Sequence, residues 1–201
     1  KALELLNNEK IPSLIRISIF HYLFGYIHPF YDGNGRTSRF ITSYYLSKVL
    51  NTLVAMRLSL TIKDSTRVYY KLFENTNSVG NAGDLTPFIT GFLWLIEKSI
   101  ERVYSELEVR MTTLNRLMSV PPISEIKNST DKKIYYVLLQ AMLFSSEGAT
   151  LEEISNTVSS GKRTIRRRIE GYPKEHIVVK KQHRAYSYYL NNNIWESTKD
   201  N

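Results

Sequence analysis

The chain has no cysteine among its 201 residues and no long apolar run. The absence of cysteine excludes disulfide bridges, thiolate zinc sites and cysteine nucleophiles. No stretch approaches the roughly 20 apolar residues that a membrane-spanning helix needs, and no charged-then-apolar leader stands at the start. Because nothing opposes a reducing compartment, we expect a cytoplasmic protein with no membrane partner.

What is present is typical of a packed globular protein. Hydrophobic residues make up 42% and charged residues 23% of the chain, which excludes disordered, collagen-like and coiled-coil classes. Lysine and arginine number 27 against 19 acidic residues, so the net charge is +8 and favours a polyanionic partner such as nucleic acid or nucleotide. Residues 1–130 and 131–201 each contribute +4, so the shorter segment is denser in positive charge.

Helical periodicity dominates the first 118 residues. From Ile11 to Ile27, apolar residues recur three and four apart on most sides, which is typical of a helix buried at the centre of a bundle. Pro29 predicts that this helix ends near His28. Similar patterns predict helices over 36–50, 65–75 and 86–118. We therefore expect an α-helical domain over residues 1–118.

A second, smaller domain is predicted over residues 131–201, after a linker at 119–130 that is rich in proline, serine and asparagine. The patterns predict three helices and two strands over 131–144, 150–158, 160–171, 177–179 and 185–190. Three helices and a β-hairpin describe a winged helix-turn-helix. We expect a mainly α protein with two domains.

The segment from His28 to Arg39, HPFYDGNGRTSR, carries the chemistry. Its glycines permit backbone geometries in which successive N–H groups point into one concavity, and the following helix adds its positive dipole end. Arg36 and Arg39 are three residues apart, so both side chains can reach one anion. The segment therefore predicts a phosphate site.

Two residues of this segment suggest a reaction at that site. Asp32 offers a hard oxygen ligand for Mg²⁺ shared with phosphate oxygens. His28 can act as a base for an attacking hydroxyl, a role that contributes about 10² to 10⁴ in rate. Each residue alone has an ordinary interpretation as a helix cap, a turn or a solvated charge. Their combination within twelve residues favours the catalytic interpretation.

This segment resembles the signature of the Fic family, HPFx(D/E)GNGRxxR, and matches every typed position. The resemblance extends from about Ile11 to Leu95. It implies an all-α core, here a Fic-type helical bundle that is incomplete at its N-terminus. It also implies a nucleotidyltransferase, specifically a protein adenylyltransferase, which transfers AMP from ATP to a serine, threonine or tyrosine hydroxyl of a target protein and releases diphosphate.

The resemblance also implies a role for each residue. His28 would deprotonate the target hydroxyl, and Asp32 would hold Mg²⁺ between the α- and β-phosphates. Asn34 and the loop amides around Gly33 and Gly35 would stabilise charge on the α-phosphate. The residues expected to bind the outer phosphates or to line the nucleotide pocket are Arg36, Arg39, Tyr69, Tyr70 and Asn77. For the tyrosine pair, core packing is the alternative.

Several alternatives stay open at this point. Gly35 favours adenylylation, because phosphorylating relatives carry lysine there. Some relatives remove AMP with the same site, using a glutamate of an inhibitory motif, S/T-x-x-x-E-G/N, which has no match in this chain. We expect that motif and the target-binding flap upstream of Lys1, which would make this chain a fragment that binds ATP poorly. A DNA-binding regulator with a nucleotide-sensing core, self-modification and a homodimer are further alternatives.

The C-terminal segment carries a candidate nucleic-acid surface. On the helix predicted over 160–171, Ile165 and Ile169 share one face, and arginines lie opposite. Such a helix suits phosphate contacts in a major groove. The candidate DNA-contacting residues are Arg163, Arg166, Arg167, Lys180, Lys181 and Arg184, the last three in the expected turn of the hairpin. A solvated basic face, or one used for protein contacts, is the alternative.

Overall fold

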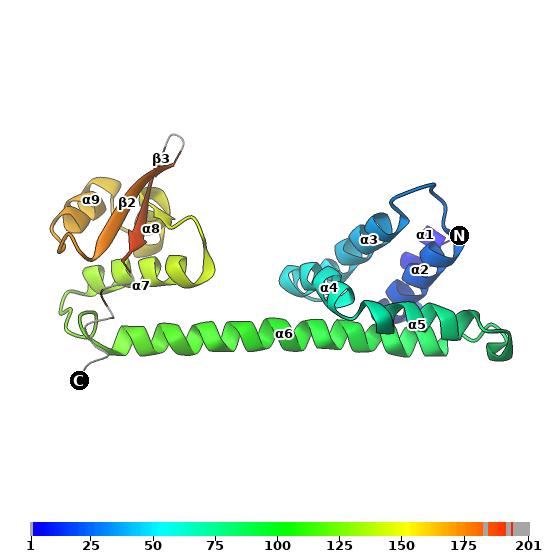
Figure 1. Cartoon of the computed structure of the whole chain (residues 1–201). Helices are drawn as coiled ribbons and strands as arrows, with labels where there is room; N and C mark the ends of the chain where they lie inside the picture. Colours follow the sequence, from blue (N-terminus) through cyan, green and yellow to red (C-terminus); the bar gives the residue numbers. More distant parts are fainter. Residues whose placement is uncertain (1, 183–184, 192–193, 195–201) are drawn as a thin grey trace. The chain divides into compact units, whose positions relative to one another are not determined.

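The structure is a computed structural model that describes residues 2–182, 185–191 and 194. The chain divides into two compact units, Lys1–Glu106 and Leu107–Asn201. Most of the described residues are helical, and the strands form one small antiparallel sheet in the second unit (Figure 1). The predicted fold class, mainly α with a small β-hairpin, is confirmed.

The N-terminal unit is built from helices (Figure 1). Their bounds are α1 (Ala2–Leu6), α2 (Ser13–Ile27), α3 (Asn34–Val49), α4 (Thr52–Asp64), α5 (Thr66–Asn77), the 3₁₀ turn η1 (Val79–Asn81) and the first part of α6 (Thr86–Ser119). The structure adds α4 to the predicted helices. Its start is capped by the Asn51 side chain, which accepts a hydrogen bond from the Leu53 N–H at 2.8 Å.

Helix α2 lies at the centre of this unit's core, as its apolar residues on most sides predict. Ile17 and Phe20 are fully buried among apolar side chains of α3 to α6. The largest of these partners are Leu46, Leu58, Phe88, Phe92 and Leu95. Burying α2 matters for function, because its last turn fixes where the signature loop begins.

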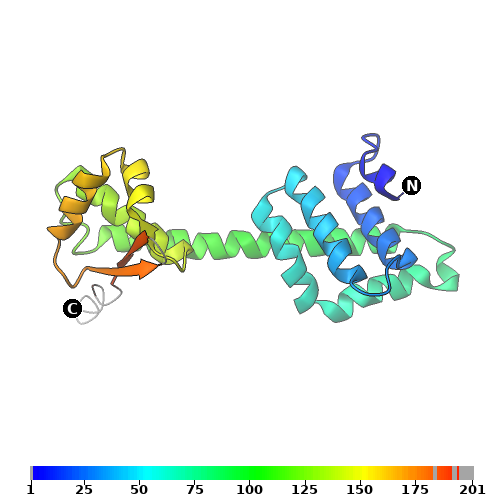
Figure 2. The ribbon, with the colours of Figure 1, turned by 90° about the horizontal axis from the view of Figure 1, so that it is seen from above.

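The C-terminal unit contains the predicted three helices and hairpin, seen from above in Figure 2. Its elements are α7 (Ser129–Phe144), β1 (Ala149–Thr150), α8 (Leu151–Val158), α9 (Lys162–Glu170), β2 (Ile177–Gln182) and β3 (Ala185–Leu190). The sheet order is β1-β3-β2, with both pairs antiparallel. Thr150 and Glu153 form a capping box at the start of α8. The short strand β1 is not among the elements predicted from the sequence.

Strand β2 is longer than the sequence predicts, which corrects the placement of two lysines. Lys180 lies opposite Ser187, and Lys181 lies opposite Tyr186, so both are strand residues and not turn residues. Pairing with β3 continues past Val179 because the opposite strand offers partners over the same length. These two basic residues therefore lie on a strand of the hairpin.

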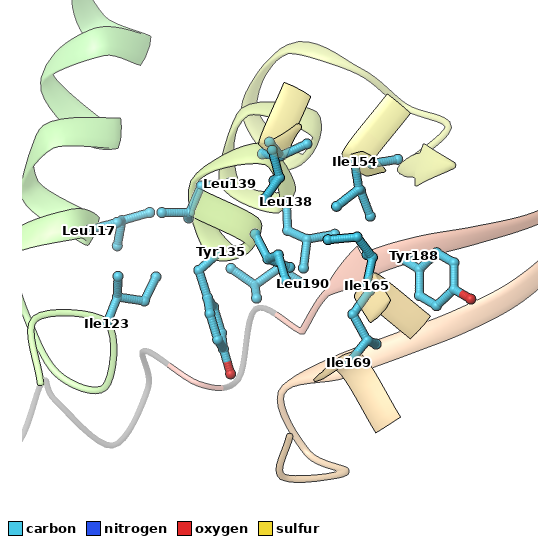
Figure 3. Close-up of a cluster of buried hydrophobic side chains, with 14 of the residues drawn as sticks. Leu117, Ile123, Tyr135, Leu138, Leu139, Ile154, Ile165, Ile169, Tyr188 and Leu190 are labelled. Atoms are coloured by element: carbon cyan, nitrogen blue, oxygen red, sulfur yellow. The ribbon is translucent and has the colours of Figure 1, made fainter. Parts of the chain in front are cut away.

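The core of the C-terminal unit draws on the end of α6 (Figure 3). Leu117 packs with Leu139, and Ile123, from the predicted linker, is fully buried in the same cluster. The division between compact units, after Glu106, thus falls inside α6 and earlier than the expected domain end at residue 118. The physical reason is that the last turns of α6 and the segment 119–130 supply apolar side chains to this core.

A partly buried polar cluster fixes α9 to α7 within this unit. The Arg168 guanidinium donates from Nη1 to both carboxylate oxygens of Asp131, at 3.0 and 3.1 Å. The Tyr172 hydroxyl donates to Asp131 Oδ1 at 2.7 Å. One arginine of α9 is therefore used inside the unit.

Within the described part of the chain, every helix is too short or too polar to cross a membrane.

Candidate active site

The signature loop connects two helices whose ends are set by local backbone geometry. His28 caps the C-terminus of α2 in the left-handed region, with φ 50° and ψ 57°, and its N–H donates to the Phe24 carbonyl at 3.1 Å. Gly33 caps the N-terminus of α3, also with a positive φ, of 82°. Glycine adopts this conformation without a Cβ penalty, so Gly33 permits the turn that aims the first N–H groups of α3 at the loop.

The His28 ring is exposed, and its only described hydrogen bond determines which nitrogen carries the proton. Nδ1 lies 3.3 Å from the carbonyl oxygen of Gly25, one turn earlier. A carbonyl oxygen only accepts, so Nδ1 must be the N–H donor in the neutral ring. The lone pair of the neutral ring is then on Nε2. That tautomer is the one a general base requires.

The Asn34 side chain holds the loop in shape. It is 4% exposed, its Oδ1 accepts from the Phe30 N–H at 2.9 Å, and its Nδ2 donates to the Phe30 carbonyl. These two bonds close a ring between α3 and the residue after Pro29. The buried side chain therefore fixes the backbone N–H groups that follow it, and its contact with an α-phosphate stays a prediction.

Asp32 and Arg36 face solvent together. The Asp32 carboxylate accepts from the Gly33 N–H at 2.6 Å and lies 3.3 Å from Arg36 Nη2, while the two side chains are 84% and 78% exposed. Such an exposed pair is weak, so either group is available to a ligand. Among the described residues, no cluster of three or more histidine or acidic side chains could hold a metal ion by itself. A single exposed carboxylate, such as that of Asp32, fits Mg²⁺ that takes its other ligands from phosphate oxygens and water.

The absence of a side chain at Gly35 leaves room for the Arg39 guanidinium. A Cβ at position 35 would lie 3.2 Å from Arg39 Nη1, closer than ordinary contact. Arg39 is half-buried and passes close enough to the core to act electrostatically on His21 and Tyr69. Gly35 therefore keeps open the space that the second signature arginine occupies.

Arg36 and Arg39 also border a hollow between α3 and α4. It has a volume of about 500 Å³, and its other lining residues are Phe40, Ser43, Tyr44, Ser47, Thr52, Ala55, Met56 and Ser59. Sequence reasoning identified the two arginines but not these neighbours. The signal was available in the helical spacing of Arg36, Phe40, Ser43 and Ser47, which places them on one side of α3. Neither His28 nor Asp32 lines this hollow.

His21 is a residue that sequence reasoning missed. Its ring is fully buried, with Nδ1 2.8 Å from Thr42 Oγ1 and Nε2 2.9 Å from the Tyr69 hydroxyl, and it stacks on Phe92. Burial, with a smaller contribution from Arg39, lowers the pKa of His21 to about 3. The ring is therefore neutral and joins α2, α3 and α5.

The structure separates the three residues predicted to line a nucleotide pocket. Tyr69 lies in the core, where burial raises the pKa of its hydroxyl to about 12, so core packing accounts for this residue. Tyr70 is 66% exposed with its ring edge against Tyr69. Asn77 is exposed, and its Oδ1 accepts a hydrogen bond from the Tyr22 hydroxyl at 2.7 Å. Only Tyr70 and Asn77 thus face solvent.

The candidate nucleic-acid residues lie on two elements of the C-terminal unit. Arg163, Arg166 and Arg167 are exposed on α9, and Lys180 and Lys181 are exposed on β2. Arg184 lies outside the described residues. The remaining arginine of this run, Arg168, belongs to the internal cluster with Asp131 and Tyr172.

Comparisons with known proteins agree with the signature. The Fic/DOC family model matches residues 1–46. The chain is 33% identical over 99 residues to a protein named protein adenylyltransferase Fic from Drosophila erecta, covering 48% of this chain and 18% of that protein. It is 34% identical over 105 residues to protein adenylyltransferase fic-1 from Caenorhabditis elegans, with the same coverage.

These matches cover about half of this chain and less than a fifth of those relatives. A solved structure of a Fic family protein from Desulfovibrio desulfuricans G20 superposes with a TM-score of 0.48 at 21% identity, covering 95% of this chain and 53% of that one. The residues that the family model matches include the signature loop whose geometry is described above. Residues 1–46 of this chain are therefore similar to the Fic/DOC family.

Proposed function

We propose that this protein transfers AMP from ATP to a serine, threonine or tyrosine hydroxyl of a target protein. The observation that carries the proposal is the state of His28. Its Nδ1 lies 3.3 Å from the Gly25 carbonyl oxygen, which assigns the proton of the neutral ring to Nδ1 and the lone pair to Nε2, and His28 directly precedes the glycine-containing loop. A free imidazole lone pair next to an anion-binding loop supports hydroxyl attack on a phosphorus atom.

In the proposed reaction, the hydroxyl oxygen attacks the α-phosphorus while His28 Nε2 accepts its proton. The bond between the α-phosphorus and the oxygen that bridges to the β-phosphate breaks, and diphosphate leaves. Negative charge grows on the α-phosphate oxygens during attack. The backbone N–H groups at the start of α3, held by the two bonds between Asn34 and Phe30, support stabilisation of that charge.

The leaving diphosphate also needs positive charge. We propose that Arg36 and Arg39 bind the β- and γ-phosphates, because they are adjacent on α3 and line one hollow. Asp32 would hold Mg²⁺, which when bound neutralises charge between neighbouring phosphates. ATP binding would then compete with the weak Asp32–Arg36 pair, freeing both side chains for the ligand.

The test uses the full-length protein with ATP labelled on the α-phosphate and, separately, on the γ-phosphate. We expect α-label, and no γ-label, on a protein hydroxyl, whether on a target or on the protein itself. His28→Ala should reduce the α-label by about 10² to 10⁴-fold. Lys63→Ala, at an exposed position of α4, is the control and should leave it unchanged.

Each alternative gives a different result in this assay. Transfer of γ-label would indicate phosphorylation and contradict the proposed orientation of the nucleotide. Label that persists in His28→Ala would remove the proposed base. Loss of AMP from a pre-modified protein, without incorporation from ATP, would indicate that removal of AMP is the reaction of this site.

A further inference from the structure

We infer that the C-terminal unit binds duplex DNA through α9, with the hairpin β2–β3 beside it. The inference goes beyond AMP transfer, because it concerns a different unit and no residue of the signature loop.

Helix α9 presents arginine on the side opposite its buried residues. Ile165 and Ile169 are 0% and 6% exposed and face the core. At 100° per residue, positions 163, 166, 167 and 170 fall within about 100° of arc, with 163 and 167 opposite the buried residues and 166 and 170 beside them. All four are exposed, and they are three arginines and one glutamate. The solvent face of α9 is therefore a compact guanidinium surface.

The arginines of this face have no acidic partner in the described part of the chain. Arg168, on the side of the helix, pairs with Asp131, and Lys162 pairs with Glu152 at 3.1 Å. No ion pair within the described ranges involves Arg163, Arg166 or Arg167. Charge that the protein does not neutralise internally creates a strong positive potential toward solvent. A polyanion would supply the missing countercharge.

Helix α9 packs on the core of its unit and follows α8 in a helix-turn-helix arrangement. Only residues 159–161 separate α8 from α9, with Ser159 in the left-handed region at φ 55°. Ile154, Val158 and Ile165 pack into one core, shown in part in Figure 3, and Arg168 clamps the far side through Asp131. A projecting second helix of this kind fits the major groove, which is about 12 Å wide.

The hairpin extends the basic surface. A hollow of about 430 Å³ lies between α9 and the strands, and its lining includes Arg166 and Lys174 on one side and Val179 and Tyr186 on the other. Lys180 and Lys181 are exposed on the same hairpin. Arg166 and Lys174 are the basic residues that line this hollow. By strand alternation Lys181 shares the face of β2 that carries Val179, whereas Lys180 lies on the other face and lines a second hollow with Val178 and Tyr189. A duplex, which carries phosphates on both sides of its groove, matches this arrangement better than a single acidic segment does.

Glu170 argues for contact with bases as well as phosphates. On a surface that bound only phosphates, its carboxylate would repel the ligand. In the major groove a carboxylate accepts from the amino group of cytosine, and arginine donates two bonds to guanine. The α9 face therefore suits a site that contains G·C pairs.

The experiment measures binding of the full chain, without ATP, to a fluorescent random-sequence DNA duplex of about 20 base pairs at several salt concentrations. The test variant is Arg163→Gln/Arg166→Gln/Arg167→Gln. The control, Lys63→Gln/Arg67→Gln/Lys71→Gln, removes the same charge from exposed positions of the N-terminal unit. Circular dichroism checks that both variants fold.

We expect the test variant to lose about 10²-fold in affinity near 0.1 M salt, and its slope of log K against log salt to fall by about 3 in magnitude. The control should retain the parent slope. Absence of duplex binding, or equal losses in both variants, would overturn the inference. Equal displacement of the duplex by polyglutamate would point to an acidic protein, and self-association that disappears in the test variant would point to a second copy; either result also overturns it.

Discussion

The two compact units each tie their helices together with a cluster of polar side chains, but the clusters differ in charge. In the N-terminal unit, His21 joins Thr42 and Tyr69 through hydrogen bonds of 2.8 and 2.9 Å, and all three groups are neutral. In the C-terminal unit, the cluster of Asp131, Arg168 and Tyr172 is built on an ion pair.

The difference follows from burial. His21 is fully buried, where a charged ring would lose its hydration, so only a neutral donor and acceptor is tolerated. The side chains of Arg168 and Asp131 are 31% and 21% exposed, and partial hydration lets the pair remain charged. We therefore expect the two clusters to differ in how strongly they depend on each member and on pH.

The largest effect is expected from His21→Ala. The substitution opens a cavity beside Phe92 and leaves the Thr42 and Tyr69 hydroxyls buried without their partner. The free energy of unfolding should fall by about 4 kcal/mol, measured by urea denaturation followed by circular dichroism. His28→Ala, the same change at the exposed end of α2, should cost about 0.5 kcal/mol. Equal losses at the two positions would contradict the role given to His21.

Asp131→Ala should produce the next largest loss, about 3 kcal/mol. It removes the acceptor of both Arg168 and Tyr172, leaving a partly buried guanidinium without a countercharge. Urea denaturation measures the change. Because the site is partly hydrated, the loss in free energy of unfolding should be smaller than that of His21→Ala. A larger loss for Asp131→Ala would contradict the expected difference between the neutral and the charged cluster.

Acidification should weaken the N-terminal cluster by about 2 kcal/mol between pH 7 and pH 5. The pKa of His21 is about 3 in the folded protein, below its ordinary value of 6.5. The unfolded state therefore takes up the proton first, so the stabilisation is complete above pH 6.5 and is lost progressively as the pH falls toward 3. Unfolding at both pH values measures the loss. It should shrink in His21→Ala, and an unchanged pH dependence in that variant would count against the buried neutral ring.

The smallest effects are expected from a matched pair of hydroxyl deletions. Tyr172→Phe should cost about 1 kcal/mol, because Asp131 keeps two bonds from Arg168. Tyr69→Phe should cost somewhat more, since His21 Nε2 then has no described partner in a fully buried site. Thermal unfolding of the two variants side by side tests this order, and a larger loss for Tyr172→Phe would reverse it.

Much of the fold could be predicted because its patterns are local. Apolar spacing and Pro29 predict the central helix and its end near His28, and the pattern over 150–158 predicts α8. The sequence pattern predicts that the first strand of the hairpin ends at Val179, with Lys180 and Lys181 in the turn. Pairing with Ser187 and Tyr186 extends the strand, and such pairing depends on a partner that lies elsewhere in the chain.

The sequence by itself determined the signature, since the order of a base, a carboxylate, glycines and arginines within twelve residues is readable without coordinates. Only the tertiary structure decided the environment of each group. It buried Tyr69 against His21, joined Asn34 to Phe30, and separated Arg168 from the exposed arginines of α9. The physical reason is that burial and hydrogen-bond partners come from segments distant in the chain, whereas residue type and helical face are set locally.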